Sequence, residues 1–574
     1  MPALARKLRK SLLFTIVVLV GGGALLIFWN RPHRVDMASY VPAESVAFLE
    51  ANDTAELANG LSGTEAWRAL AVPLGAPERL ISHPWLVSFA RWSGIGSTES
   101  VLLARSQFAL CVTQAQATES GSTLTIKPLA ALIIETHTRQ GRMQSTIERY
   151  VDQLARESYG STVVVIQKQV NGADFREWST ADNSRRLVVS IVDTVAIIGN
   201  DESIVMACLD VHARKHKSIA EDSQFQSTRQ TMTDARSAVF AYVPKAGVKL
   251  VIQAWALSRT SNSPDAASMA PLISNTFGNL IDRFAWTSRF DDAGAEDSCH
   301  VALAQDVTQQ FSSLASAEPV SSLDHSLVPA GAVSVTSYTL KDPKSFWPQL
   351  NSVISSHSDV LGAIASRPLL QGLLEPYGIR DADRFFAAIG PRIQIIRLDQ
   401  SAPAVLVAEA ADSLALRKIA AERVGTNPKL EHTAQAEILT SATDDWSVAF
   451  IDKYFLSGPA DEVRRCLEAK ERGESIPNVA AFQRAKSVID MSLPIFSLTF
   501  ADDRTSAISV VEQFSKQERS AFSTNAAAIQ QGAASLQYLA SVTSIRNNSV
   551  EWTSRSSFGL VGTLLNMFAR EKMP

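Results

Sequence analysis

Cysteine is scarce in this sequence of 574 residues, which contains only Cys111, Cys208, Cys299 and Cys466. No C-x-x-C pair occurs, so the pattern of a dithiol redox centre or a zinc ribbon is missing. Four thiols in a chain of this length do not make a disulfide framework. We therefore expect buried free thiols, and the alternative is a single disulfide that involves Cys111 or Cys299.

The common catalytic motifs are missing as well. The sequence has no G-x-S-x-G elbow, no H-E-x-x-H, no G-x-x-x-x-G-K-[ST] loop, and no G-x-G-x-x-G after a strand. These absences remove the usual signs of an α/β-hydrolase, a zinc protease, a P-loop NTPase and a dinucleotide enzyme. We predict no cofactor, and no familiar class of enzyme is indicated.

A surplus of positive charge is absent too. Lys and Arg number 54 against 58 Asp and Glu, for a net charge of −4. Residues 1–34 hold six of the bases and no acid, so the remainder of the chain has a net charge of −10. Such a body has no basic surplus for phosphate backbones, which argues against a nucleic-acid partner. Otherwise the composition is globular, with 46% apolar residues and a length that suits about three or four domain-sized units.

One long uncharged run stands near the N-terminus. Residues 11–29, SLLFTIVVLVGGGALLIFW, form nineteen residues that roughly match a hydrocarbon core of about 30 Å. A cleaved secretory signal is the alternative, but no A-x-A-like cleavage site follows before Asn30. We expect a transmembrane anchor over 11–29, a basic cytoplasmic tail over 1–10 and a linker over 30–40.

The flanking charges predict the orientation of this anchor. Four bases precede it (Arg6, Lys7, Arg9 and Lys10), whereas only Arg31 and Arg34 follow it closely. The positive-inside rule then keeps the N-terminus in the cytoplasm. We predict a single-pass protein of a bacterial inner membrane, with a periplasmic or extracellular body and the lipid bilayer as its partner through 11–29.

The rest of the chain contains an internal repeat. Val41–Val46 (VPAESV) corresponds to Val328–Val333 (VPAGAV) at an offset of 287 residues. Further matches keep the same order while the offset falls steadily to 256, as for Thr287-Ser288 and Thr543-Ser544. Loss of loop residues from a second copy produces such a trend, whereas chance similarity scatters the offsets. The alternative is that generic strand and helix patterns were aligned.

We therefore predict two homologous lobes, 41–316 and 328–571, joined by a polar linker over 317–327. Within each lobe, β-rich runs break at Asp193-Thr194 and at Asp452-Lys453, as two-residue hairpins do. Strands joined by hairpins with helices between them predict an α+β fold. Each lobe is then a largely antiparallel sheet with packed helices.

Three features together resemble a known family: the N-terminal anchor, the V-P-A-x-x-V opening at Val41–Val46, and the stretch from Val192 to Gln226 (VDTVAIIGNDESIVMACLDVHARKHKSIAEDSQFQ). The family is a bacterial envelope domain of unknown function, DUF 3352. The resemblance covers most of 41–571 and implies a membrane-anchored ectodomain, with no established activity or site residue. The second copy departs from the pattern, because Pro459-Ala460 follows its glycine.

One group of residues has metal-like spacing. Cys208, His212 and His216 lie at i, i+4 and i+8, which places three candidate ligands on one face of a helix. The neighbours Arg214 and Lys215 would repel a cation, so two solvated histidines at a basic helix end are the alternative interpretation.

The sequence thus favours a membrane-anchored binding or scaffolding protein with an envelope protein or a lipid as partner. The alternative is an envelope hydrolase whose site has an unfamiliar order. Such a site needs a histidine beside a Ser or an acid, and the candidates are His83, His137, His300 and His432. The apolar C-terminal run 560–568 is expected to be a core helix rather than a membrane contact.

Overall fold

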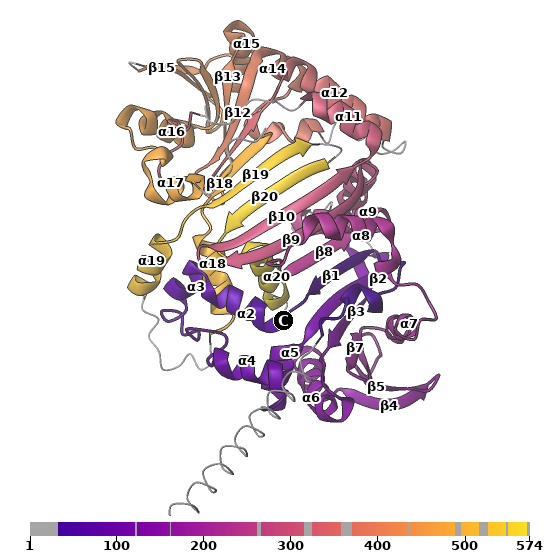
Figure 1. Ribbon diagram of the computed structural model, residues 1–574. Helices are drawn as coiled ribbons and strands as arrows, with labels where there is room; N and C mark the ends of the chain where they lie inside the picture. Colours follow the sequence, from indigo (N-terminus) through magenta and orange to yellow (C-terminus); the bar gives the residue numbers. More distant parts are fainter. Residues whose placement is uncertain are drawn as a thin grey trace, which may run out of the picture.

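The computed structural model describes residues 33–574 except 121–122, 161, 261–265, 315–323, 358–369, 434, 488, 490–494, 516–525, 547–548 and 571–574. Within these residues twenty strands form one antiparallel sheet with helices on both of its faces (Figure 1). The predicted α+β class and the antiparallel pairing are confirmed.

The first half of the chain contributes ten strands to the sheet. Their bounds are β1 Ala47–Ala51, β2 Gln107–Ser120, β3 Thr123–Glu135, β4 Val164–Val170, β5 Ala173–Ser179, β6 Arg186–Val192, β7 Val195–Gly199, β8 Val239–Val243, β9 Ile281–Asp291 and β10 Gly294–Leu303. The hydrogen-bonded order is β4-β5-β6-β7-β3-β2-β1-β8-β9-β10.

The second half contributes the other ten. They are β11 Ser334–Thr339, β12 Ile389–Arg397, β13 Val405–Ala410, β14 Lys429–His432, β15 Ala436–Thr440, β16 Trp446–Ile451, β17 Tyr454–Pro459, β18 Ser497–Ala501, β19 Leu539–Arg546 and β20 Ser549–Ser556. Their order is β14-β15-β16-β17-β13-β12-β11-β18-β19-β20. The ten strands of each half are therefore hydrogen-bonded to one another in the same order.

The helices pack on the two faces of this sheet. In the first half they are α2 Thr54–Gly63, α3 Glu65–Leu70, α4 Pro84–Ser93, α5 Thr98–Arg105, α6 Gln140–Tyr159, α7 Glu202–His212, α8 Ser223–Met232, α9 Lys245–Thr260, α10 Ala266–Phe277 and α11 Gln305–Leu314, with short 3-10 helices η1 Met37–Tyr40 and η2 Ile219–Glu221. In the second half they are α12 Pro343–His357, α14 Ala382–Ala388, α15 Ser413–Val424, α16 Ala460–Arg472, α17 Ala480–Ser487, α18 Arg504–Glu512, α19 Ala526–Ala534 and α20 Gly559–Arg570, with η4 Glu375–Tyr377 and η5 Ile476–Asn478.

The two halves do not have separate sheets, which corrects the expectation of one sheet per lobe. The last strands of the halves, β10 and β20, pair antiparallel over eight residue pairs from Ala295↔Ser556 to Ala302↔Ser549. Figure 1 shows β9, β10, β20 and β19 side by side in the middle of the molecule. A continuous ladder of hydrogen bonds therefore joins the two halves.

Helices also cross from one half to the other. Trp67 of α3 is fully buried, and its ring lies 5.2 Å from that of Phe514 and 6.3 Å from that of Phe558, both in the second half. In return, α11 at the end of the first half packs on α12, where His357 Nε2 lies 2.6 Å from Asp306 Oδ2. The apolar cores of the halves are thus shared.

The two predicted hairpin turns are confirmed. The strands β6 and β7 are joined through Asp193-Thr194, and Asp193 adopts a φ of 54°, as a tight hairpin requires. Asp452 has a φ of 49° at the corresponding turn of the second half. Asp201 caps α7 by accepting a hydrogen bond from the main-chain N–H of Ser203 at 2.9 Å.

Both predicted linkers include residues that belong to the folded body. Met37 and Ala38, placed in the 30–40 linker, have no exposed surface and belong to the core of the first half. His325 and Leu327, placed in the 317–327 linker, are 5% and 2% exposed in the second half. Each half therefore begins several residues before its V-P-A motif. The sequence indicated a later start because the few apolar residues that enter the core are flanked by polar ones.

The C-terminal helix α20 packs on α18 and on strands β9, β10 and β20, so residues 560–567 belong to a core helix as expected. In the described part of the chain, no helix combines the length and the apolar character that crossing a bilayer requires. The predicted anchor 11–29 and tail 1–10 lie outside the described residues.

Candidate binding surface on the central strands

The four strands where the halves meet carry polar side chains on one of their faces. Alternation along a strand sends every second residue to the same side, and directly opposed residues share that side. One side of β9, β10, β20 and β19 is mainly apolar, with Trp286, Cys299 and Trp552 in register. The other side, which we call the central face, is mainly polar and consists of Arg283, Ala285, Thr287, Arg289, Glu296, Ser298, His300, Ala302, Ala540, Val542, Ser544, Arg546, Ser549, Glu551, Thr553 and Arg555.

A chain of ion pairs crosses the central face from one half to the other. Glu296 on β10 accepts from Arg289 on β9 and, at 3.1 Å, from Nη1 of Arg555 on β20. Arg555 also pairs with Asp291. Partial burial opposes ionisation of Asp291, but the Arg555 guanidinium outweighs it and holds the pKa of Asp291 below its ordinary value. Opposite charges in register stabilise the ladder between the halves.

A small pocket of about 210 Å³ opens on this face. It lies between the end of α8 and strands β9 and β10, and Met232, Asp234, Thr287, Arg289 and Ser298 contribute to its wall. Arg289 is held there by Asp234 at 3.5 Å. The pocket therefore offers hydroxyl groups and already neutralised charges, which suit a polar partner surface better than an anion.

His300 is one of the four histidines considered for a hydrolase. It lies on β10 opposite Glu551 of β20 and Ala285 of β9. Burial lowers the pKa of His300, although the Glu551 charge opposes this effect. The imidazole is therefore neutral at pH 7, and no hydrogen bond of its side chain to a serine is found among the described residues.

The apolar side of the same strands is fixed to the C-terminal helix through a buried carboxyl group. Asp297 has no exposed surface, and it accepts from Trp286 Nε1 at 2.9 Å and from the main-chain N–H of Leu560 at 2.8 Å. Burial raises the pKa of Asp297. This contact sets the position of α20 against the seam between the halves.

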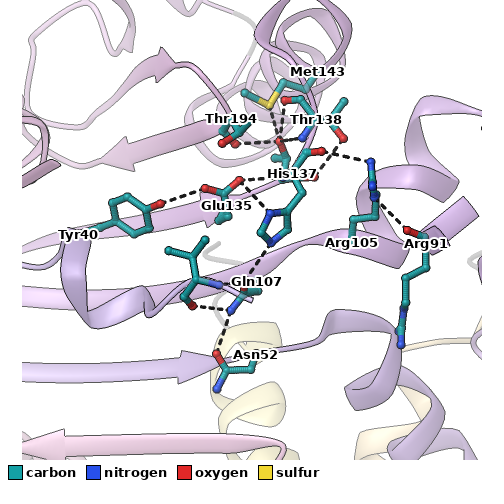
Figure 2. A network of polar contacts seen from close by, with 12 residues as sticks. Tyr40, Asn52, Arg91, Arg105, Gln107, Glu135, His137, Thr138, Met143 and Thr194 are labelled. Carbon is teal, nitrogen blue, oxygen red and sulfur yellow. Dashed lines mark hydrogen bonds and ion pairs between the residues drawn. The ribbon is translucent and has the colours of Figure 1, made fainter. Parts of the chain in front are cut away.

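His137 belongs to a second polar group, at the end of strands β1, β2 and β3 (Figure 2). Its Nε2 lies 3.0 Å from Gln107 Oε1, and its main-chain N–H donates to Glu135 Oε1 at 2.8 Å. Tyr40 donates to the other oxygen of Glu135 at 3.1 Å. Burial is the main reason that the pKa of His137 is lowered.

This second polar group holds the N-terminal segment of the body in place. Gln107 is 1% exposed, and its side chain exchanges two hydrogen bonds of 2.9 Å with the main chain of Val35. Tyr40 follows in η1. The network therefore fixes the segment where the chain enters the body, and its polar atoms are used for that purpose.

The remaining histidine candidates are isolated. His83 precedes α4 and makes no capping bond with its side chain, and His432 is exposed on the edge strand β14. A Ser–His–Asp contact that the sequence did not suggest occurs at Ser356, His357 and Asp306. However, His357 Nδ1 lies 2.8 Å from the carbonyl oxygen of Val353, and the hydroxyl of Ser356 donates to that same carbonyl. The arrangement leaves no base for Ser356.

The metal-like group is not assembled. Helix α7 ends at His212, and Arg214 then adopts a φ of 57°, so His216 does not share the helical face of Cys208. Cys208 points into the core, where its Sγ lies 3.9 Å from Sγ of Cys111. Among the residues whose placement is described, no group of three or more His, Cys, Asp or Glu side chains is arranged to hold a metal ion.

All four cysteines are buried free thiols, as expected. The central face, by contrast, was not anticipated. Its signal is the alternation of polar and apolar residues in 294–303 and 549–556, which by itself indicates only two amphipathic strands. Their pairing across more than 250 residues has no local signature.

Comparisons with known proteins add little. No family model matches the chain, and no curated protein matches it at a significant level. Among solved structures, crystal forms I and III of TP0453 match with TM-scores of 0.22 and 0.24 and 10% identity, over 47% and 50% of this chain and 80% and 90% of theirs. TM-scores this low carry no argument about fold or function. The resemblance to DUF 3352 stays a prediction.

Proposed function

We propose that this chain is a membrane-anchored, extracytoplasmic binding or scaffolding protein that engages an envelope partner through the central face. The observation that carries the proposal is that opposed residues form two polar rows across β9, β10 and β20, the strands that join the two halves. The rows are Arg289, Glu296 and Arg555, and Thr287, Ser298 and Thr553. Thr553 is exposed, and Arg289, Glu296 and Arg555 form ion pairs beside it. Non-obligate protein interfaces are about as polar as the rest of a protein surface and are enriched in arginine, so this face is compatible with such a partner.

The proposal includes a tandem duplication as the origin of the two halves. It is supported by the identical connection order of the ten strands in each half and by the matched hairpin turns at Asp193 and Asp452. It also places the body outside the cytoplasm of a bacterium on the anchor 11–29, supported by the charge asymmetry around that segment.

Recovery of a partner in mild detergent tests the binding surface. The intact protein is purified beside Thr553→Arg, which places a large cation on the central face, and beside Leu414→Arg, whose position on α15 is 75% exposed and far from it in sequence. We expect the wild type and Leu414→Arg to co-purify with the same envelope protein or lipid. The amount of this partner recovered with Thr553→Arg should be about tenfold lower. A clean, ligand-free monomer for the wild type in every condition contradicts the proposal.

Protease treatment of spheroplasts tests the location separately. The proposal predicts that the body is digested from outside while a fragment that contains residues 1–32 stays in the membrane pellet. Full protection of the body until the cells are lysed contradicts the predicted orientation.

A further inference from the structure

The helix α4 presents an unusual apolar surface outward. Trp85, Leu86 and Phe89 are 68%, 41% and 45% exposed. The opposite side of the helix is used for packing, since Ala90 is 2% exposed and lies in a small core with Val101 and Ala104 of α5. Three large exposed apolar residues within five positions form a patch that marks an interaction site.

Helix α4 contacts the same carboxylate as the segment that leads to the predicted anchor. Arg91 of α4 donates to Asp53 Oδ1 at 2.7 Å, and Arg34 Nη2 lies 3.7 Å from the other oxygen of the same carboxylate. Arg91 is held further by its Nε, which donates to the carbonyl oxygen of Ala104 at 3.0 Å. The chain at residue 34 and the helix α4 therefore meet at one side chain.

The length of chain beyond this point limits the distance to the bilayer. Four residues lie between Trp29, the last residue of the apolar run, and Arg34, which makes five Cα-to-Cα steps. Even fully extended, they span at most about 18 Å. With the Arg34 side chain and its contact added, the Asp53 carboxylate stays within about 30 Å of the membrane boundary, and α4 stays beside it.

The chemistry of the patch suits a lipid surface. Tryptophan and phenylalanine are preferred where acyl chains meet headgroups, and a short amphipathic helix lies in that plane with its apolar face down. Arg34 is exposed, and Arg31 precedes it in the sequence, so positive charge is available for anionic headgroups beside the patch.

We propose that α4 docks through Trp85, Leu86 and Phe89 onto the outer leaflet of the same bilayer that holds the anchor. This inference rests on the proposed function, because it requires the anchor 11–29. Docking gives the body a second point of attachment, which restricts its rotation on the tether and fixes the direction of the central face relative to the membrane.

The experiment places an environment-sensitive fluorophore on the helix. The full chain with Leu86→Cys is labelled and reconstituted in vesicles of phosphatidylcholine and phosphatidylglycerol, with and without lipids brominated near the headgroup. Leu414→Cys on α15 is the control, because that position is 75% exposed in the other half. The four native thiols are buried and serve as the unlabelled background.

Docking predicts a blue-shifted probe at position 86 that brominated lipid quenches at least about threefold more than the probe at position 414. The added changes Trp85→Ser and Phe89→Ser should reduce that quenching to the control level, while the protein stays in the vesicles after an alkaline wash. If the probes at positions 86 and 414 are quenched equally while the protein still resists the alkaline wash, the docking proposal is wrong and the anchor is still supported.

Two other outcomes also decide the question. A blue shift at position 86 without quenching by brominated lipid means that a protein surface, such as a second copy, covers the patch, and it overturns the lipid proposal. Release of the protein by the alkaline wash overturns the anchor, and docking falls with it.

Discussion

At the scale of single residues, the body contains ionisable groups whose behaviour follows from burial. Glu50 on β1 is 1% exposed, and its carboxylate lies 2.7 Å from Nη2 of Arg229 on α8. Arg229 also pairs with Asp36 at 2.6 Å, beside η1. The corresponding position of the second half is Ser337, so this charged cluster belongs to the first half alone in the described part of the chain.

We expect the burial of Glu50 to make the stability of the protein depend on pH. Burial raises the pKa of Glu50 from 4.5 to about 7, although Arg229 opposes the change. The folded state therefore binds more protons than the unfolded state between these values, and the free energy of unfolding falls as the pH rises through that window. The loss is on the order of 3 kcal/mol.

Urea unfolding at pH 5, 6 and 7 measures this effect. We expect Glu50→Gln to flatten the decline, whereas the same change at the exposed Glu471 keeps the slope of the wild type. An unchanged slope in Glu50→Gln would show that other groups cause it.

The buried cysteines should react slowly with alkylating reagents. Burial raises the pKa of the Cys299 and Cys466 thiols, and the contact with Cys111 together with burial raises that of Cys208. Only the thiolate reacts quickly with alkylating reagents. Mass spectrometry should therefore find no labelled cysteine in the native chain at pH 7.5 and four in the unfolded chain. Rapid labelling of the native chain would contradict the buried thiols.

At the scale of helices and strands, contacts between the halves depend on close backbone approach. A Cβ on Gly532 of α19 would lie 2.6 Å from the carbonyl oxygen of Ala69 in α3. These helices come from opposite halves of the chain and pack together. A glycine is therefore required at this contact, since the opposing atom is backbone and has little freedom to move.

Replacement of this glycine tests the contact. Gly532→Ala should lower the free energy of unfolding by roughly 1–3 kcal/mol, despite the better helix propensity of alanine. Gly372→Ala is the matched control, because nothing lies within 4 Å of its Cβ. That variant should be neutral or about 1 kcal/mol more stable. Equal midpoints of the two variants in urea would exclude a tight α19–α3 contact.

The sequence predicted the elements that local chemistry determines. The turns at Asp193 and Asp452 have a signature within a few residues, so they could be found without a partner strand. The pairing of β10 with β20 depends on residues such as Ala295 and Ser556, which are far apart in sequence. Neither strand differs from an ordinary amphipathic strand, so the central face could not be assembled from sequence.

At the scale of the whole molecule, the continuous ladder and the shared cores predict one cooperative unit. Trp67 of the first half is buried partly by Phe558 of the second, and the β10–β20 pairing exposes two edges when it is broken. Halves produced separately as 1–316 and 317–574 should therefore fail to unfold cooperatively, whereas co-expressed halves should assemble. Calorimetry checks this. Two halves that melt independently at the midpoint of the intact chain would contradict a single unit.

We propose that the seam between the halves is the surface that meets a partner outside the cytoplasm. A photo-reactive amino acid at Thr553, in the intact protein and in living cells, tests it most directly, with the same residue at Leu414 as control. We expect a discrete cross-linked product from position 553 and none from position 414. Absence of a product at 553, or the same products at both positions, would contradict it.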